Sequence, residues 1–133
     1  MSNTVASNKD IILAYVKAIE AQDFKKARQL LADENFVYIG PNMVFDNADQ
    51  MLTFMFSMAP ILKDIDARRI VGEGDEVCMM VDYKTFFEPI GDVRVALWAQ
   101  IDNGKIQKLE VFYNAAVVEN MLSVDGELPF GKS

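Results

Sequence analysis

The second half of the chain carries long β-prone segments joined by turn sequences, and this pattern limits the possible fold more than any other feature. The segments cover 76–87, 93–101 and 105–115, after a shorter one at 65–71. Asn103-Gly104, between the last two segments, is typical of a two-residue β-hairpin. Strands of about 9–12 residues extend roughly 30–40 Å, and a sheet of that length twists and curves. We therefore expect a curved antiparallel sheet.

The first half shows helical periodicity instead. Apolar residues recur every three or four positions between Ile12 and Ile19, as on the buried face of a helix. Side chains that can accept hydrogen bonds from a first helical turn precede this segment and two later ones. We expect helices to begin after Ser7, Asp23 and Asn47, the last helix to end before Pro60, and a short strand at 35–39.

Helices followed by antiparallel hairpins predict an α+β fold. Helices that lie across the concave face of a curved sheet leave a cone, and the open end of the cone is a natural ligand site. The length of 133 residues indicates one domain. We expect a flexible lead-in at 1–7, the domain at 8–120 and a C-terminal tail at 121–133.

The amino-acid composition excludes several classes of partner and cofactor. The net charge of −7 disfavours nucleic acid, because the protein surface would repel the phosphate backbone. The chain has no histidine and a single cysteine, Cys78, so Ser-His-Asp catalysis is excluded and neither a zinc site nor another cofactor is expected. No apolar stretch reaches the roughly 18 residues of a membrane span, and no signal-peptide pattern is present, so we predict a cytoplasmic protein without a membrane partner.

Several local sequences resemble those of a known family. Tyr15 precedes Ala21-Gln22-Asp23-Phe24, the segment 30–34 leads into a strand at 36–38, and two late strands contain Arg94-Val95-Ala96-Leu97-Trp98 and the run 105–114. In these features, over about residues 8–118, the chain resembles the NTF2-like superfamily, in particular its SnoaL-like and ketosteroid-isomerase-like branch. The resemblance implies a cone-shaped fold with an internal pocket and frequent dimerisation through the outer face of the sheet.

The resemblance does not extend to the isomerase mechanism, in which a carboxylate moves the proton while a tyrosine and a protonated aspartic acid hold the oxyanion. Tyr15 falls on the tyrosine position. The base position falls on Ile39 or Gly40, and the aspartic acid position falls on Leu97. The catalytic carboxylates of the isomerases are therefore absent, and whether the chain is an enzyme stays open.

The predicted pocket lining is mainly apolar. In the family register the hydroxyls of Tyr15 and Tyr113 face the cone, where they could orient a carbonyl group of a hydrophobic ligand, or they could be core aromatics bonded to backbone or water. The cone could likewise be filled by its own side chains. The residues we predict to bind a ligand are Tyr15, Ile19, Ile39, Phe54, Met55, Met79, Val81, Leu97, Val111 and Tyr113, whereas Tyr38 and Tyr83 are expected at the rim or in the core.

Asp82 is an unusual residue because it interrupts an apolar strand between Val81 and Tyr83. If it faced the pocket, desolvation would raise its pKa and make it the one candidate catalytic base. The alternative places Asp82 on the outer face, paired with Arg94 or Lys84.

The outer sheet face is a predicted interface. Because successive strand residues point to opposite faces, Trp98 faces away from Leu97. We therefore predict a homodimer interface at Trp98, Phe112 and Arg94, or else that Leu128 and Phe130 of the tail cover this face.

The predicted pocket and the predicted interface suggest two alternative functions. The chain is either a small-molecule-binding protein with a hydrophobic pocket or a non-catalytic dimeric protein-interaction module.

Overall fold

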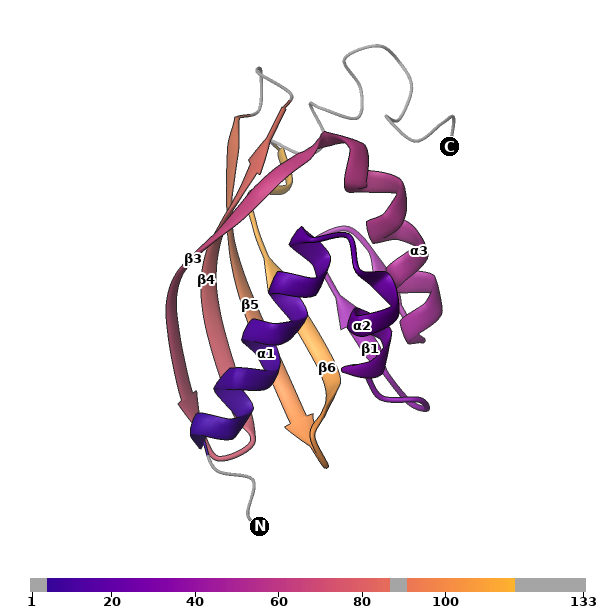
Figure 1. The fold of residues 1–133 in the computed structure, drawn as a ribbon, viewed down its shortest axis with the longest axis vertical. Coiled ribbons are helices and arrows are strands. Elements are labelled where there is room, and N and C mark those ends of the chain that lie inside the picture. Colours follow the sequence, from indigo (N-terminus) through magenta and orange to yellow (C-terminus); the bar gives the residue numbers. More distant parts are fainter. Residues whose placement is uncertain (1–4, 87–90, 117–133) are drawn as a thin grey trace.

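Helices come first along the chain and long strands follow. The computed structural model describes residues 5–86 and 91–116. Its elements are α1 (Val5–Glu20), α2 (Phe24–Gln29), β1 (Val37–Ile39), β2 (Val44–Phe45), α3 (Ala48–Met58), the 3-10 helix η1 (Ala59–Ile61), β3 (Leu62–Glu73), β4 (Glu76–Thr85), β5 (Asp92–Asp102) and β6 (Lys105–Phe112) (Figure 1).

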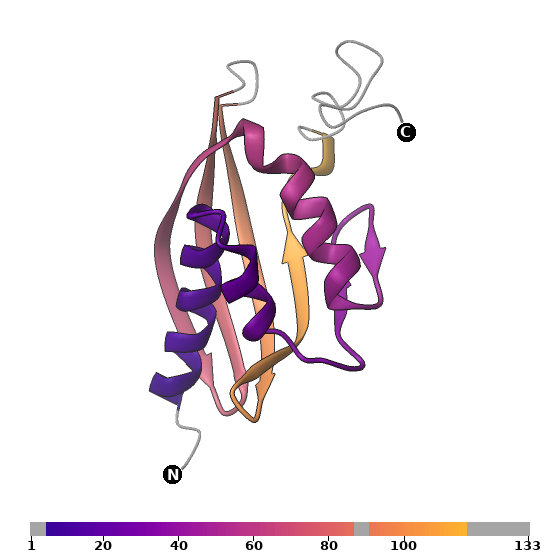
Figure 2. The same ribbon diagram turned by 45° about the vertical axis from the view of Figure 1, so that its right-hand side comes forward.

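The strands form one six-stranded sheet in the order β2-β1-β6-β5-β4-β3. The sheet is curved and does not close, and α1, α2 and α3 all lie on its concave side (Figures 1 and 2). This arrangement confirms the predicted α+β cone. The sheet is antiparallel except for β1, which pairs with β6 in the parallel direction. Neither this pair nor the short strand β2 was predicted from the sequence. The sequence of a three-residue strand contains nothing that specifies which strand it pairs with or in which direction.

The predicted caps form. The Asp23 side chain accepts a hydrogen bond from the Lys26 backbone N–H at 3.1 Å, and Asn47 Oδ1 accepts one from the Gln50 N–H at 2.8 Å. Each bond satisfies a backbone donor that the first helical turn leaves without an intrahelical partner. Past Met58 the chain tightens into η1, which contains Pro60. These local signals therefore set the positions of α2 and α3.

The start of α1 differs from the prediction. The helix begins at Val5, before the expected cap at Ser7, so residues 5–7 belong to the helix and not to a lead-in. Val5 and Ala6 can both adopt helical geometry, and Ala favours it, so nothing in this segment stops the helix at Ser7. The predicted tail at 121–133, with Leu128 and Phe130, lies outside the described residues.

The β5–β6 hairpin is confirmed, and its turn explains the strand register. Asn103 and Gly104 both have positive φ angles, 53° and 75°, as a type I′ turn requires. Strand alternation then separates the two faces of β5. Leu97 is buried in the core cluster with residues of α1, whereas Trp98 is 47% exposed on the convex face.

Candidate functional site

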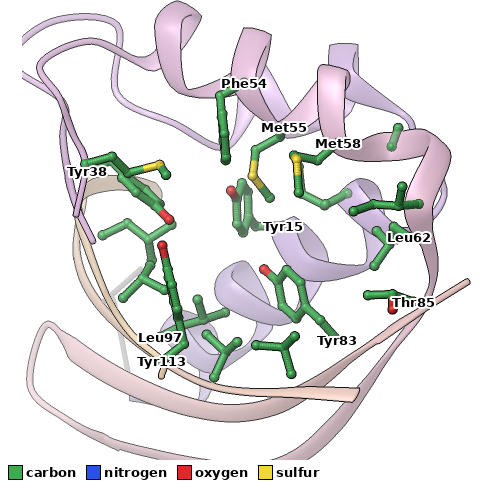
Figure 3. A pocket seen from close by; sticks show the side chains of 18 of the residues that line it. Tyr15, Tyr38, Phe54, Met55, Met58, Leu62, Tyr83, Thr85, Leu97 and Tyr113 are labelled. Atoms are coloured by element: carbon green, nitrogen blue, oxygen red, sulfur yellow. The ribbon is translucent and has the colours of Figure 1, made fainter. Parts of the chain in front are cut away.

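A cavity opens at the wide end of the cone, between the sheet and the helices α1 and α3 (Figure 3). Its volume is about 120 Å³, close to that of an apolar cavity that accepts one benzene ring. The walls come from nearly every element of the fold. The lining residues are Tyr15, Ile19, Phe24, Tyr38, Met43, Phe54, Met55, Met58, Ala59, Ile61, Leu62, Tyr83, Thr85, Val93, Val95, Leu97, Leu109, Val111 and Tyr113.

The polar side-chain groups of this lining are four phenol hydroxyls and the hydroxyl of Thr85. All four tyrosines of the sequence are present, contributed by α1, β1, β4 and the segment after β6. Among the described residues, the lining contains no lysine, arginine, aspartate or glutamate. The described lining can therefore offer apolar contact and neutral hydrogen bonds, but no carboxylate that could act as a general base.

Seven of the predicted ligand-binding residues line this cavity, namely Tyr15, Ile19, Phe54, Met55, Leu97, Val111 and Tyr113. Three others do not. Met79 and Val81 are fully buried in the core cluster, which also contains residues of α1, whereas their register partners Leu97 and Val95 on β5 reach the cavity. On β1 the buried residue is Tyr38, so Ile39 lies on the opposite face of that strand. These three positions correct the prediction; ligand binding by the other seven stays a prediction.

Tyr38 and Tyr83 were expected at the rim or in the core. Tyr38 does belong to the core cluster and Tyr83 packs against it, and both also line the cavity. The position of Tyr83 within its strand could have predicted that it faces the cavity. It lies two residues after Val81 and four after Met79, so all three point to the concave side of β4. Unlike Met79 and Val81, Tyr83 is only half-buried, and it lines the cavity together with Tyr15 of α1.

Two of the four hydroxyls already have protein partners. The Tyr15 hydroxyl donates to Met51 Sδ at 3.5 Å, and the Tyr113 hydroxyl donates to Asn42 Oδ1 at 3.2 Å. For Tyr38 and Tyr83 the described residues provide no hydrogen-bond partner to the hydroxyl. In Figure 3 the oxygens of Tyr38 and Tyr83 point towards the middle of the cavity.

The phenols are held in their neutral form. Burial raises the pKa of Tyr15, Tyr38 and Tyr83, and the nearby tyrosines raise these pKa values further, because a second phenolate would be repelled. For Tyr83 the pKa rises to about 12. These hydroxyls therefore carry their protons at neutral pH and can donate hydrogen bonds.

Asp82 lies outside the cavity, on the convex face of β4. Its Oδ2 accepts a hydrogen bond from Arg68 Nη1 at 3.0 Å, and its Oδ1 accepts one from Arg94 Nε at 3.2 Å. Arg94 is its direct neighbour on β5, whereas Lys84 pairs with Asp92. This position corrects the interpretation of Asp82 as a pocket base and agrees with the alternative of an outer-face ion pair.

The ion pairs of Asp82 predict a pH-dependent stability. Partial burial alone would raise its pKa, but the hydrogen bonds from Arg94 and Arg68 outweigh this effect and hold the pKa below its ordinary value. A lowered pKa in the folded state stabilises the fold above the unfolded-state pKa of about 4, and the benefit is lost as pH falls through the folded-state pKa. The difference in unfolding free energy between wild type and Asp82→Asn should therefore be constant near neutral pH and shrink in acid. Urea unfolding of both proteins across this range measures it, and a pH-independent difference would contradict it.

The convex face carries an apolar patch formed by Met80, Ala96, Trp98 and Phe112. Met80, Ala96 and Phe112 are register partners across β4, β5 and β6, and Trp98 follows two residues after Ala96. Trp98 and Phe112 are each 47% exposed. The Trp98 indole N–H donates to Glu76 Oε1 at 2.9 Å, which leaves the ring surface open to solvent. No described helix crosses this face (Figures 1 and 2).

Two other kinds of site, a metal site and a membrane span, have no counterpart within residues 5–86 and 91–116. No group of three or more histidine, cysteine, aspartate or glutamate side chains is arranged to hold a metal ion in that part of the chain. None of the helices described there has both the length and the apolar character needed to span a membrane.

A curved, unclosed sheet that wraps around N-terminal helices and encloses a cavity at its open end is the NTF2-like fold, and the chain has this fold. No protein-family model matches the sequence, and no curated protein matches it. Solved structures do match. One is an NTF2-like protein of Cytophaga hutchinsonii, with a TM-score of 0.74, 18% identity and coverage of 90% of this chain and 99% of that one.

Two further structures are similar. A protein of Jannaschia sp. CCS1 named as a SnoaL-like polyketide cyclase has a TM-score of 0.77 at 15% identity, over 95% of this chain and 98% of its own. A Catenulispora acidiphila protein with a ketosteroid-isomerase-like fold, solved in complex with trimethylamine, has a TM-score of 0.70 at 14% identity, over 81% and 88%. Similarity at these identities concerns the fold, which many unrelated functions share.

Proposed function

We propose that this chain is a binding protein for a small hydrophobic ligand that carries a carbonyl or similar polar group. The observation that carries the proposal is the cavity itself, with a volume of about 120 Å³ and walls of apolar side chains and neutral hydroxyls. Apolar pockets with a few convergent polar groups are the usual form of small-molecule sites. The names of two similar structures, a polyketide cyclase and a trimethylamine complex, also refer to small organic molecules.

Binding rather than isomerisation is the activity that this lining supports. Isomerisation of the family type needs a carboxylate within reach of the ligand, and the cavity lining has none within residues 5–86 and 91–116. The open cavity also favours small-molecule binding over the alternative of a filled cone that acts only in protein interactions. We assign no reaction to the site, and the cytoplasmic location stays a prediction.

A thermal-shift screen with a blocked variant tests this function. A ligand that binds only the folded state at ten times its Kd adds about 1.4 kcal/mol to the unfolding free energy, so the Tm of wild type should rise by several degrees. Val93→Trp should abolish the rise, because Val93 is a half-buried lining residue of β5 and the indole would occupy the cavity.

Val71→Trp is the matched control, since Val71 is exposed on β3 and does not line the cavity. It should keep the ligand-induced rise. The absence of any shift with a broad panel of neutral apolar compounds, or a shift that Val93→Trp retains, would contradict the proposed site.

A homodimer is the second part of the proposal, because the convex patch exposes two aromatic rings that no described element covers. Exposed apolar patches of this kind often mark protein interfaces. We infer that Trp98 and Phe112 meet their counterparts in a second copy, with Arg94 at the edge of the interface. The dimer is compatible with ligand binding, since the cavity opens on the opposite face of the sheet.

A further inference from the structure

The two tyrosines whose hydroxyls have no hydrogen-bond partner among the described residues lie on different walls of the cavity. Tyr38 belongs to β1 and Tyr83 to β4, and these strands are separated in the sheet by β6 and β5. Tyr38 is 6% exposed, and Tyr83 is half-buried. Figure 3 shows both hydroxyls directed towards the middle of the cavity. A ligand in the cavity therefore meets two hydroxyls from two directions.

These hydroxyls differ from those of Tyr15 and Tyr113, which already donate to Met51 and Asn42. A hydroxyl with a partner gains little from a ligand, because one hydrogen bond must break for the other to form. The unpartnered hydroxyls of Tyr38 and Tyr83 lose no protein hydrogen bond when a ligand binds. The polar part of ligand recognition should therefore fall on Tyr38 and Tyr83.

The chemistry of the lining limits what these hydroxyls can bind. Their protons stay in place at neutral pH, so each can donate to a ligand oxygen. A buried carboxylate or phosphate needs a charged partner, and the part of the lining that the structure describes has no cation. A quaternary ammonium group prefers ring faces, whereas the hydroxyl ends of Tyr38 and Tyr83 point into the cavity.

We propose that Tyr38 and Tyr83 are the specificity-determining hydrogen-bond donors of the pocket, and that they select neutral ligands with an acceptor oxygen over hydrocarbons, anions and cations of the same size. This inference rests on the proposed binding function. It assigns the polar recognition to two residues outside the ligand-binding set predicted from sequence, and it leaves Tyr15 and Tyr113 as parts of the wall.

A matched pair of one-ring ligands tests the proposal. Acetophenone and α-methylstyrene have almost the same shape, but the second carries a CH₂ group where the first has its carbonyl oxygen. One neutral hydrogen bond contributes about 0.5–1.5 kcal/mol, so each lost hydroxyl should weaken acetophenone binding between about twofold and tenfold. Tyr38→Phe, Tyr83→Phe and the double variant should therefore raise the Kd for acetophenone and leave the Kd for α-methylstyrene nearly unchanged. NMR chemical-shift titration measures both constants.

Thr53→Val is the control, because it removes a hydroxyl that lies outside the cavity, on an exposed residue of α3 that donates to the Asp49 backbone oxygen. It should leave both Kd values nearly unchanged. Each tyrosine variant keeps its aromatic ring, and its Tm reports whether it folds; the single variants serve if the double variant does not fold. Benzoate should not bind wild type.

The outcomes separate this inference from the proposed function. Suppose that wild type binds both ligands, and that the tyrosine variants raise the two Kd values equally or change neither. The donor role is then wrong and the binding function stands. If phenyltrimethylammonium binds more tightly than acetophenone in wild type and in the double variant, ring faces recognise the ligand and the inference is overturned. If wild type binds neither acetophenone nor α-methylstyrene up to their solubility, the proposed function falls and the inference with it.

Discussion

Trp98→Glu is expected to convert the proposed homodimer into a monomer. In a two-fold interface across the convex patch, the substitution removes two large apolar contacts and places two carboxylates near each other. Glu76 and Glu110 already lie beside Trp98, so the added charge meets like charges. Aromatic residues at the centre of an interface contribute about 2–4 kcal/mol each, so the dimer dissociation constant should rise at least 30-fold.

The charges of the convex face are compatible with such a dimer. Arg68 and Arg94 lie at one end, around Asp82, while Glu76 and Glu110 lie near Trp98. An antiparallel two-fold arrangement would bring the arginine end of one copy towards the glutamate end of its partner. Such complementarity favours one orientation of two copies over others. The same geometry places Arg94 at the rim of the contact.

Sedimentation velocity over a range of protein concentrations measures the change in mass. Val44→Glu is the control, because Val44 is 63% exposed on β2, at the edge of the sheet and outside the patch. It should leave the dimer intact. Wild type that sediments as a monomer at all concentrations would contradict the dimer, and a dimeric Trp98→Glu protein would place the interface elsewhere.

Met79→Ala is expected to lower the unfolding free energy by about 2–5 kcal/mol. Met79 has 0% exposure and lies in the core cluster between β4 and α1. Truncation to alanine removes buried apolar contacts and leaves a cavity that the rigid sheet can only partly close. Because Met79 does not line the ligand cavity, the Kd for acetophenone should stay nearly unchanged in the folded variant.

The neighbouring methionine is the control. Met80 has the same side chain, but it is 36% exposed on the convex face, so Met80→Ala should cost less than about 1 kcal/mol. Urea unfolding of the three proteins gives the comparison. Equal losses for the two variants would contradict the inward parity of Met79, and an altered ligand affinity with unchanged stability would make Met79 a pocket residue after all.

Sequence alone determined the features that depend on neighbours along the chain. A cap needs a side chain within three residues of its donor, so Asp23 and Asn47 could be located without knowledge of the fold. The Asn103-Gly104 turn follows from two residues that tolerate positive φ. Strand alternation then placed Leu97 and Trp98 on opposite faces of the sheet, Leu97 inside the cone and Trp98 on the convex face.

Tertiary structure alone decided which inward-facing residues reach the cavity. Met79 and Tyr83 have the same parity on β4, yet Met79 is fully buried in the core cluster and Tyr83 lines the cavity. The parallel pairing of β1 with β6 brings Tyr38 to the cavity wall, and the pairing of β3 with β4 brings Arg68 to Asp82. Periodicity specifies which face of a strand a side chain occupies, but which element covers that face depends on contacts between segments far apart in the chain.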